Sequence, residues 1–155
     1  GIERREYRMR EFGSWERSLQ LDAQLIAVGK SVSIEFRYDL MKRTPNTFDA
    51  HRLIWLAGQV GVQDAMVETL FRAYFSEGRN IGDASVLAEL AAEAGIERAR
   101  AEALLAGTEG SAEVAGDEEV AMRAGLSGVP TFVLDGRVLF SGAQSPEAIA
   151  RALSQ

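Results

Sequence analysis

Few residues of this chain could carry out chemistry. The single histidine, His51, cannot by itself form a histidine metal cluster, and a serine triad needs a separate base and orienting group. The sequence contains no cysteine, so the chain as given has no disulfide, no thiolate metal site and no cysteine nucleophile. The acidic run at residues 117–119 is typical of a solvated helix surface. These observations predict neither a catalytic residue nor a metal site in this chain.

Pro130 is the most informative of the remaining candidates. It precedes an apolar run at residues 131–134, and a proline at the first position of a strand loses no important hydrogen bond. The other interpretation is a cis Val129-Pro130 bond, because the cis form before proline is only about 0.5–1 kcal/mol less stable than trans. A cis bond would leave the backbone N–H and C=O of Val129 pointing outward, where they could pair with an extended peptide. Both interpretations remain open on the local residues.

The residues after Pro130 predict a β-hairpin. Two runs rich in β-branched and aromatic residues, 131–134 and 137–140, are separated by Asp135-Gly136. This dipeptide is favoured in type I′ hairpin turns, which need positive φ angles at both central positions. The runs are apolar on nearly every position, so both faces of the hairpin should be covered. A lone hairpin is only marginally stable, so further strands or helices must complete it.

Capping residues and apolar spacing predict that most of the remaining chain is helical. Ser14 is expected to cap a helix that begins at Trp15, and Thr44 one that carries Pro45 in its first turn. The other expected helices follow the caps Asp83 and Ser145 or cover residues 62–76, 97–105 and 112–124. Residues 33–38 alternate polar and apolar side chains, which fits either a half-buried strand or an extended loop.

The composition limits the kinds of partner. With 155 residues, of which 46% are apolar, the chain is long enough for one ordinary domain with a core. A formal net charge of −6 argues against a nucleic-acid backbone or an anionic membrane surface as the main partner. No apolar run approaches the roughly 18 residues of a membrane span. A set of arginines alternates with glutamates and is expected to form a solvated helix face: Arg4, Arg5, Arg8 and Arg10.

Two blocks of the sequence carry a family resemblance. The first consists of Gly128-Val129-Pro130-Thr131-Phe132-Val133, Asp135-Gly136 and Ser141-Gly142-Ala143-Gln144. It resembles the cis-proline loop and terminal hairpin of the DsbA-like branch of the thioredoxin superfamily. Within that branch it is most similar to the FrnE-like disulfide oxidoreductases and the related 2-hydroxychromene-2-carboxylate isomerases. The second block, residues 44–53, resembles the first long helix of their helical insertion.

The resemblance implies an α/β, thioredoxin-like fold with a helical insertion domain. Redox members carry Cys-x-x-Cys in an amino-terminal βαβ unit, which we expect to be missing from this chain, so that the chain as given is mostly helical. The expected domains are a helical insertion over residues 1–116 and the carboxy-terminal hairpin and helix of the thioredoxin-like domain over residues 117–155.

The implied function is the substrate side of a thiol–disulfide oxidoreductase. The expected substrate-binding residues are Val129, Pro130, Asn46 and His51, and the expected partners are a thiol or disulfide protein substrate or glutathione. No other cofactor, no nucleic acid and no membrane is expected. The reaction needs a thiolate at a helix amino terminus, so this chain should not catalyse thiol exchange alone. The resemblance also favours a cytoplasmic location, and an unfinished sheet predicts a homodimer formed by strand exchange.

Two other functions remain open. In a glutathione-dependent isomerase, a serine would replace the leading cysteine and glutathione would bind at the Val129-Pro130 loop. A cysteine-free module that binds peptides or a partner strand is the third hypothesis. The residues on the expected insertion helix also have structural interpretations, in which His51 is a hydrogen-bonded core or edge residue and Asn46 begins the helix.

Overall fold

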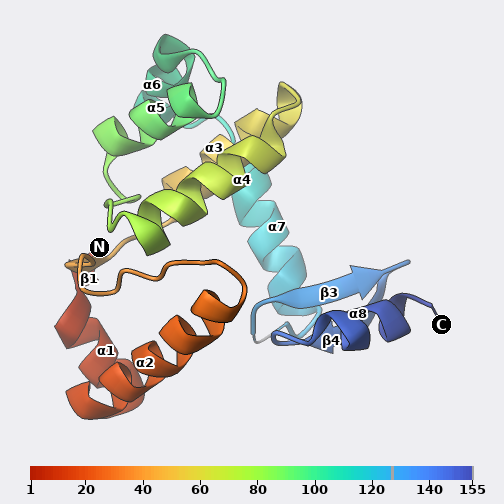
Figure 1. Cartoon of the computed structure of the whole chain (residues 1–155). Coiled ribbons are helices and arrows are strands. Elements are labelled where there is room, and N and C mark those ends of the chain that lie inside the picture. Colours follow the sequence, from red (N-terminus) through yellow and green to blue (C-terminus); the bar gives the residue numbers. More distant parts are fainter. Residues whose placement is uncertain (127, 155) are drawn as a thin grey trace. The chain divides into compact units, whose positions relative to one another are not determined.

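The computed structural model of the chain describes residues 1–126 and 128–154 and divides into two compact units (Figure 1). Unit 1 comprises Gly1–Val114 and unit 2 comprises Ala115–Gln155. The expected boundary after residue 116 lies close to this division. The interpretation of unit 1 as an insertion into a thioredoxin-like domain stays a prediction.

Unit 1 is helical apart from one short ladder. Its elements are β1 (Ile2–Glu3), α1 (Arg4–Phe12), α2 (Trp15–Ser31), β2 (Arg43–Thr44), α3 (Phe48–Gln59), α4 (Gln63–Phe71), a π-helix (Arg72–Ser76), α5 (Ala84–Glu93) and α6 (Arg98–Ala106). β1 and β2 pair antiparallel, with Ile2 opposite Thr44. This ladder joins the start of the chain to the segment that leads into α3. Every helix among the described residues is too short or too polar to cross a bilayer.

Two helix starts follow directly from their capping residues. The Ser14 hydroxyl accepts a hydrogen bond from the backbone N–H of Arg17 at 3.1 Å, and α2 begins at Trp15 as predicted. Asp83 Oδ1 accepts hydrogen bonds from the backbone N–H groups of Ser85 at 2.9 Å and Val86 at 3.2 Å, and α5 follows. Both side chains satisfy N–H groups that have no partner inside the helix.

The predicted cap of α3 is wrong. Thr44 lies in β2 rather than at a helix start, and α3 begins at Phe48. A residue before proline is disfavoured in helical conformation, and the pairing with Ile2 holds Thr44 extended. The N-cap residue of α3 is Thr47, whose side chain makes no cap bond, and Asn46 Oδ1 accepts a hydrogen bond from the N–H of Phe48 at 2.9 Å.

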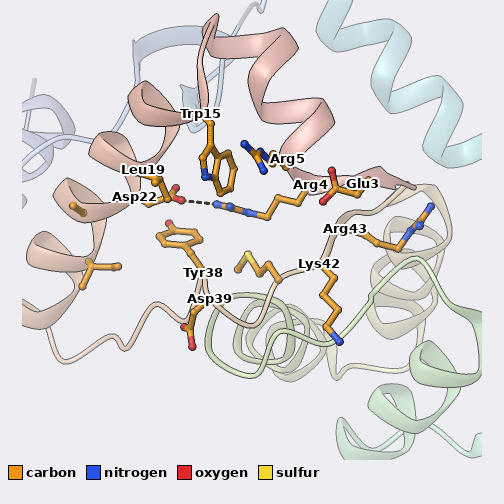
Figure 2. A pocket seen from close by; sticks show the side chains of 13 residues that line it. Glu3, Arg4, Arg5, Trp15, Leu19, Asp22, Tyr38, Asp39, Lys42 and Arg43 are labelled. Atoms are coloured by element: carbon orange, nitrogen blue, oxygen red, sulfur yellow. Dashed lines mark hydrogen bonds and ion pairs between the residues drawn. The ribbon is translucent and has the colours of Figure 1, made fainter.

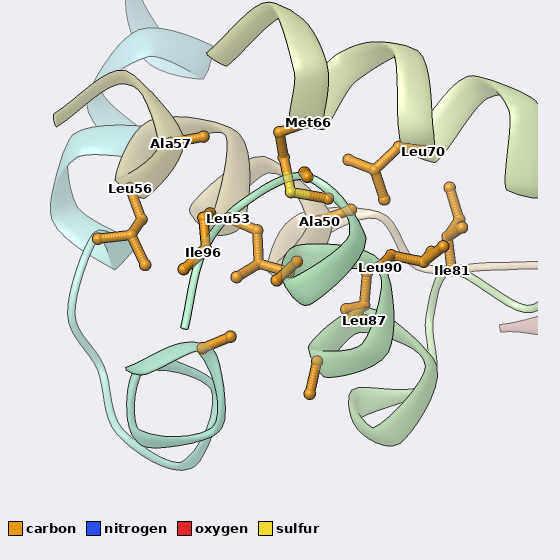
Figure 3. Close-up of a cluster of buried hydrophobic side chains, with 14 of the residues drawn as sticks. Ala50, Leu53, Leu56, Ala57, Met66, Leu70, Ile81, Leu87, Leu90 and Ile96 are labelled. Carbon is orange, nitrogen blue, oxygen red and sulfur yellow. The ribbon is translucent and has the colours of Figure 1, made fainter. Parts of the chain in front are cut away.

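The core of unit 1 lies among helices α3, α4, α5 and α6 (Figure 3). Each helix contributes at least one large side chain with 0% exposure: Leu53, Met66, Leu87, Leu90 and Leu104. Burying a side chain of this size contributes about 1.5–3 kcal/mol relative to leaving it exposed. All members of this core fall within residues 50–104, so its apolar interior is independent of the preceding segment.

Helix α2 turns polar residues inward. Ser18 is 0% exposed and Asp22 is 4% exposed, whereas Leu19 is 48% exposed. Two arginines expected on a solvated face supply their partners: Arg4 is buried and Arg8 is half-buried. The expectation for these two arginines is therefore wrong, because α2 presents acceptors that make burial of charge tolerable.

Residues 33–38 form an extended loop and not a strand. The N–H of Arg37 donates to the carbonyl of Phe75 at 2.8 Å, and the ring of Phe36 lies 5.5 Å from the ring of Tyr38 and 5.6 Å from that of Phe75. This segment is thus joined to the π-helix by one backbone hydrogen bond and by the packing of aromatic rings, without forming a strand ladder.

Unit 2 contains most of α7 (Ser111–Arg123), β3 (Thr131–Leu134), β4 (Arg137–Ser141) and α8 (Pro146–Leu153). The strands pair antiparallel with Phe132 opposite Phe140, and a register irregularity follows Phe132. The turn has the predicted positive φ angles, 49° at Asp135 and 75° at Gly136. Ser145 caps α8 through the N–H of Ala148 at 3.3 Å. The mixture of helices with small sheets is the expected α/β, mostly helical organisation.

Candidate functional site

The Val129-Pro130 loop leads into β3. Its peptide bond is cis, the second of the two interpretations of the sequence. Val129 is 93% exposed. Among the described residues, none forms a hydrogen bond with the backbone N–H or C=O of Val129. The loop therefore presents one donor and one acceptor to solvent.

The loop is attached firmly to the hairpin behind it. The carbonyl of Pro130 accepts a hydrogen bond from the N–H of Gly142 at 2.8 Å. The Thr131 hydroxyl donates to the carbonyl of Gly128 at 2.6 Å and lies 2.9 Å from the Ser141 hydroxyl. Because these bonds fix the backbone on either side of Val129, an extended chain could pair with Val129 as an added strand.

The apolar surface around the hairpin is incompletely covered. The rings of Phe132 and Phe140 lie 4.5 Å apart, yet both side chains are only half-buried. Val133 is 53% exposed and Val138 is 49% exposed. No described residue between 115 and 154 is fully buried. An apolar surface of this kind, beside strands with unpaired edges, is typical of a sheet that further chain completes.

The other two predicted site residues lie in unit 1, near the start of α3. His51 is exposed on α3, and no described side chain forms a hydrogen bond with its ring. Asn46 precedes the N-cap residue Thr47 and accepts a hydrogen bond from the N–H of Phe48 at the start of the helix, in line with its structural interpretation. The structure thus brings Asn46 and His51 to one helix start and Val129 and Pro130 to one loop of unit 2.

A charged cluster in unit 1 was not predicted as a site. Arg4 Nη2 donates to Asp22 Oδ2 at 2.6 Å, and Arg8 Nη2 donates to Asp22 Oδ1 at 2.7 Å. Arg8 Nε also donates to the Ser18 hydroxyl at 2.8 Å. A sequence signal was present, because the two arginines and the two acceptors are each spaced four residues apart and so share one face of their helix.

Arg52 was likewise absent from the predicted residues. Its side chain is 4% exposed, and it donates to the carbonyls of Leu104 at 2.5 Å, Gly107 at 2.8 Å and Glu109 at 2.8 Å. Asp49 pairs with it at 2.7 Å. Because the last carbonyls of a helix lack internal partners, this guanidinium completes the end of α6 and fixes it to α3. Its role is structural.

Two partly buried phenols of unit 1 have raised pKa values. Burial raises the pKa of Tyr38, and the charge of Asp22 adds to the effect. Burial also raises the pKa of Tyr74. Both phenols therefore stay protonated at neutral pH. Within residues 1–126 and 128–154, no group of three histidine, cysteine or acidic side chains could hold a metal ion.

Comparison with known proteins identifies the family. The model of the DSBA-like thioredoxin domain matches residues 3–154. The crystal structure of a probable DsbA oxidoreductase from Streptomyces coelicolor superimposes with a TM-score of 0.88 and 32% sequence identity. The alignment covers 98% of this chain and 66% of the Streptomyces chain.

A second solved structure shares the fold at lower identity. It is a candidate protein disulfide isomerase from Nitrosomonas europaea, with a TM-score of 0.71 and 17% identity over 90% of this chain and 73% of that one. No curated protein matches the sequence. The family match over nearly the whole length shows that this chain belongs to the DSBA-like thioredoxin domain family.

Proposed function

We propose that this chain is the substrate-side portion of a FrnE-like thiol–disulfide oxidoreductase. In this proposal the Val129 backbone holds an extended peptide, and a separate Cys-x-x-Cys segment supplies the thiol pair. The observation that carries the proposal is the exposed Val129, with its N–H and C=O unpaired within the described residues, beside a hairpin that fixes their direction.

Two further findings support the proposal. The chain spans 66% of the length of its Streptomyces relative, which is a probable DsbA oxidoreductase. The chain itself contains no cysteine. Thiol–disulfide exchange proceeds by attack of a thiolate on a disulfide sulfur, so the residues present here bind and orient the peptide but break no bond. We expect no insulin reduction by this polypeptide in the presence of dithiothreitol.

Two variants at Val129 test the strand-pairing step. The probe is insulin B chain with its cysteines carboxamidomethylated, which cannot exchange thiols. Val129→Pro removes the backbone donor, whereas Val129→Ala retains it. One hydrogen bond contributes about 0.5–1.5 kcal/mol, so Val129→Pro should weaken binding by about two- to tenfold. Val129→Ala should change it by less than about twofold.

Fluorescence anisotropy of the labelled B chain gives both affinities. Equal affinities of the two variants would contradict pairing through the Val129 backbone, as would the absence of binding to the unmodified chain. Circular dichroism checks that the variants remain folded.

A cytoplasmic location and a homodimer formed by strand exchange stay predictions.

Reduced glutathione separates this proposal from its nearest alternative. The open backbone of Val129 could also pair with the glutathione cysteinyl unit, as a glutathione-dependent isomerase of the same fold would require. Binding of glutathione at Val129, seen by NMR shifts of that amide, without binding of the B chain would favour the isomerase. Binding of the B chain alone would favour the oxidoreductase or a cysteine-free peptide-binding module.

A further inference from the structure

A cavity of about 870 Å³ in unit 1 is lined by residues of that unit alone (Figure 2). It is bounded by α1, α2 and the segment at residues 38–43. Its volume is within the range of about 300–1,000 Å³ that is usual for small-molecule sites.

One side of the cavity is apolar. Leu19, Ala23 and Ile26 line it from α2, and Met41 lines it from the segment that precedes β2. Trp15 contributes an aromatic ring at the start of α2. These side chains suit a hydrocarbon or aromatic body and offer little to a strongly hydrated ion such as free phosphate.

A buried guanidinium forms the opposite side. Arg4 is 6% exposed, and its Cζ atom lies 5.8 Å from the centre of the Trp15 ring and 5.4 Å from that of Tyr38. Figure 2 shows Arg4 reaching between these rings to Asp22. Since Arg8 pairs with the same carboxylate at 2.7 Å, two positive charges face one negative charge. This fixed arrangement favours an anion nearby.

The carboxylates that line the cavity are already engaged. Asp22 binds Arg4 and Arg8, and Asp39 binds Arg37 at 2.8 Å. Glu3 accepts a hydrogen bond from the N–H of Glu6 at 2.8 Å, and this bond lowers its pKa.

Three cations that line the cavity form no ion pair in the part of the chain that the structure describes: Arg5, Lys42 and Arg43. Arg43 donates instead to the backbone carbonyl of Gly1. The guanidinium of Arg5 lies 5.7 Å from the centre of the Trp15 ring.

We propose that this cavity binds a small amphipathic anion of the arylcarboxylate class. The aromatic body packs against Trp15, Ile26 and Met41, while the carboxylate lies toward Arg5 and Lys42. Arg4 positions the two rings and is not expected to contact the ligand directly. This site is separate from the peptide-binding loop and requires no thiol chemistry.

Isothermal titration calorimetry with 2-naphthoate tests the proposal, with the neutral 2-naphthamide as a matched probe. We expect naphthoate to bind at one site per chain and naphthamide to bind about threefold to tenfold more weakly, because exposed ion pairs contribute modestly. Raising the salt concentration should weaken naphthoate binding and leave naphthamide binding unchanged.

Charge-removing variants locate the site. The double variant Arg5→Gln/Lys42→Gln should weaken naphthoate binding to the level of naphthamide. The control Arg10→Gln/Arg17→Gln removes the same charge from exposed positions outside the cavity lining and should retain binding within about twofold. All four positions are exposed, so both variants should fold, which circular dichroism would check.

Four results would overturn the proposal. They are no binding of naphthoate at millimolar concentration, equal binding of the acid and the amide, unchanged binding by the Arg5/Lys42 variant, and an equal loss in the control. None of these results depends on peptide binding at Val129, so failure here leaves the proposed oxidoreductase function untouched.

Discussion

Asp22 is the residue on which the amino-terminal helix pair depends. Its carboxylate binds two arginines from α1, and neither arginine has another carboxylate partner within the described residues. A buried pair of this kind adds little stability relative to an apolar replacement, but removing one partner leaves uncompensated charge. The same carboxylate also orients Arg4 between the Trp15 and Tyr38 rings.

Asp22→Asn should therefore destabilise unit 1 by about 3 kcal/mol, because it leaves Arg4 and Arg8 without a counter-charge. The free energy of unfolding in urea measures the effect. Asp39→Asn is the control, since Asp39 pairs with Arg37 at an exposed position and should cost less than about 1 kcal/mol. A loss at Asp22 no larger than that at Asp39 would contradict the assigned role.

Sequence reasoning located individual residues unevenly. It identified caps such as Ser14, because a cap depends on atoms within three residues. It placed Arg4 and Arg8 in solvent, because their burial depends on acceptors on another helix. The roles proposed for His51 and Asn46 stay predictions.

At the scale of elements, the end of α2 depends on close approach to the loop that follows it. The N–H of Ile34 donates to the carbonyl of Gly29 at 2.8 Å, and Phe36 packs against Gly29. A Cβ atom on Gly29 would lie 2.6 Å from Phe36 Cδ2 and 2.7 Å from the Ile34 carbonyl oxygen. Glycine is therefore required here by space.

Gly29→Ala should destabilise the chain by about 1–3 kcal/mol, because the methyl group displaces a ring and a backbone carbonyl. The matched control is Gly116→Ala in α7, where an added Cβ meets no atom within 4 Å. Alanine is the better helix former by about 1 kcal/mol, so the control should not destabilise. Urea unfolding midpoints compare the two variants, and a harmless Gly29→Ala would refute the close packing.

The start of α5 gives a pH-dependent prediction. Hydrogen bonds from the Ser85 side chain and from the backbone N–H groups of Val86 and Ser85 hold the pKa of Asp83 below its ordinary value of 3.8. The pKa of Asp83 is therefore lower in the folded chain than in the unfolded chain. At a pH above the unfolded-state pKa, the ionised cap stabilises the folded chain. This stabilisation is lost as the pH falls through the folded-state pKa.

Asp83→Ala should thus destabilise the chain at neutral pH, and the difference from the unchanged chain should shrink as the pH falls below 3.8. Urea unfolding across this pH range measures the difference. Asp83→Ser serves as control, because a hydroxyl cap does not titrate. A difference in stability between Asp83→Ala and the unchanged chain that stays constant in acid would contradict the prediction.

The elements most faithfully predicted are those with local signals. The hairpin turn at Asp135-Gly136 and the caps of α2, α5 and α8 all follow from neighbouring residues. The start of α3 was missed, because strand pairing over a long sequence separation overrides the local preference of Thr44. The loop at residues 33–38 could not be told from a strand, since the bond that holds its middle at Arg37 comes from the distant Phe75.

At the scale of the whole molecule, the two units differ in how completely their side chains are buried. Unit 1 encloses fully buried side chains from four helices, whereas the described part of unit 2 encloses none. The family and the mixed fold could be predicted from sequence, because the proline loop and hairpin are local motifs. The cavity beside Trp15 could not, because it depends on how α1 and α2 pack with residues 38–43.

Hydrogen exchange should report the difference in side-chain burial between the two units. Amides in β3 and β4 should exchange faster than those in α3 and α5, because regions with few buried apolar contacts open at lower free energy. Mass spectrometry of peptic fragments measures both regions in one sample, so each serves as reference for the other. Hairpin amides as protected as those of α3 would show that unit 2 is more stable than its burial implies.

The residues of the main core lie on α3 to α6, on the π-helix and in the connections between these helices, and all of them fall within 50–104. A gene fragment encoding that stretch would carry a complete apolar interior with it. Recombination could therefore move this segment into another protein as one unit. Sequence changes in the flanking segments would then leave its apolar core unchanged.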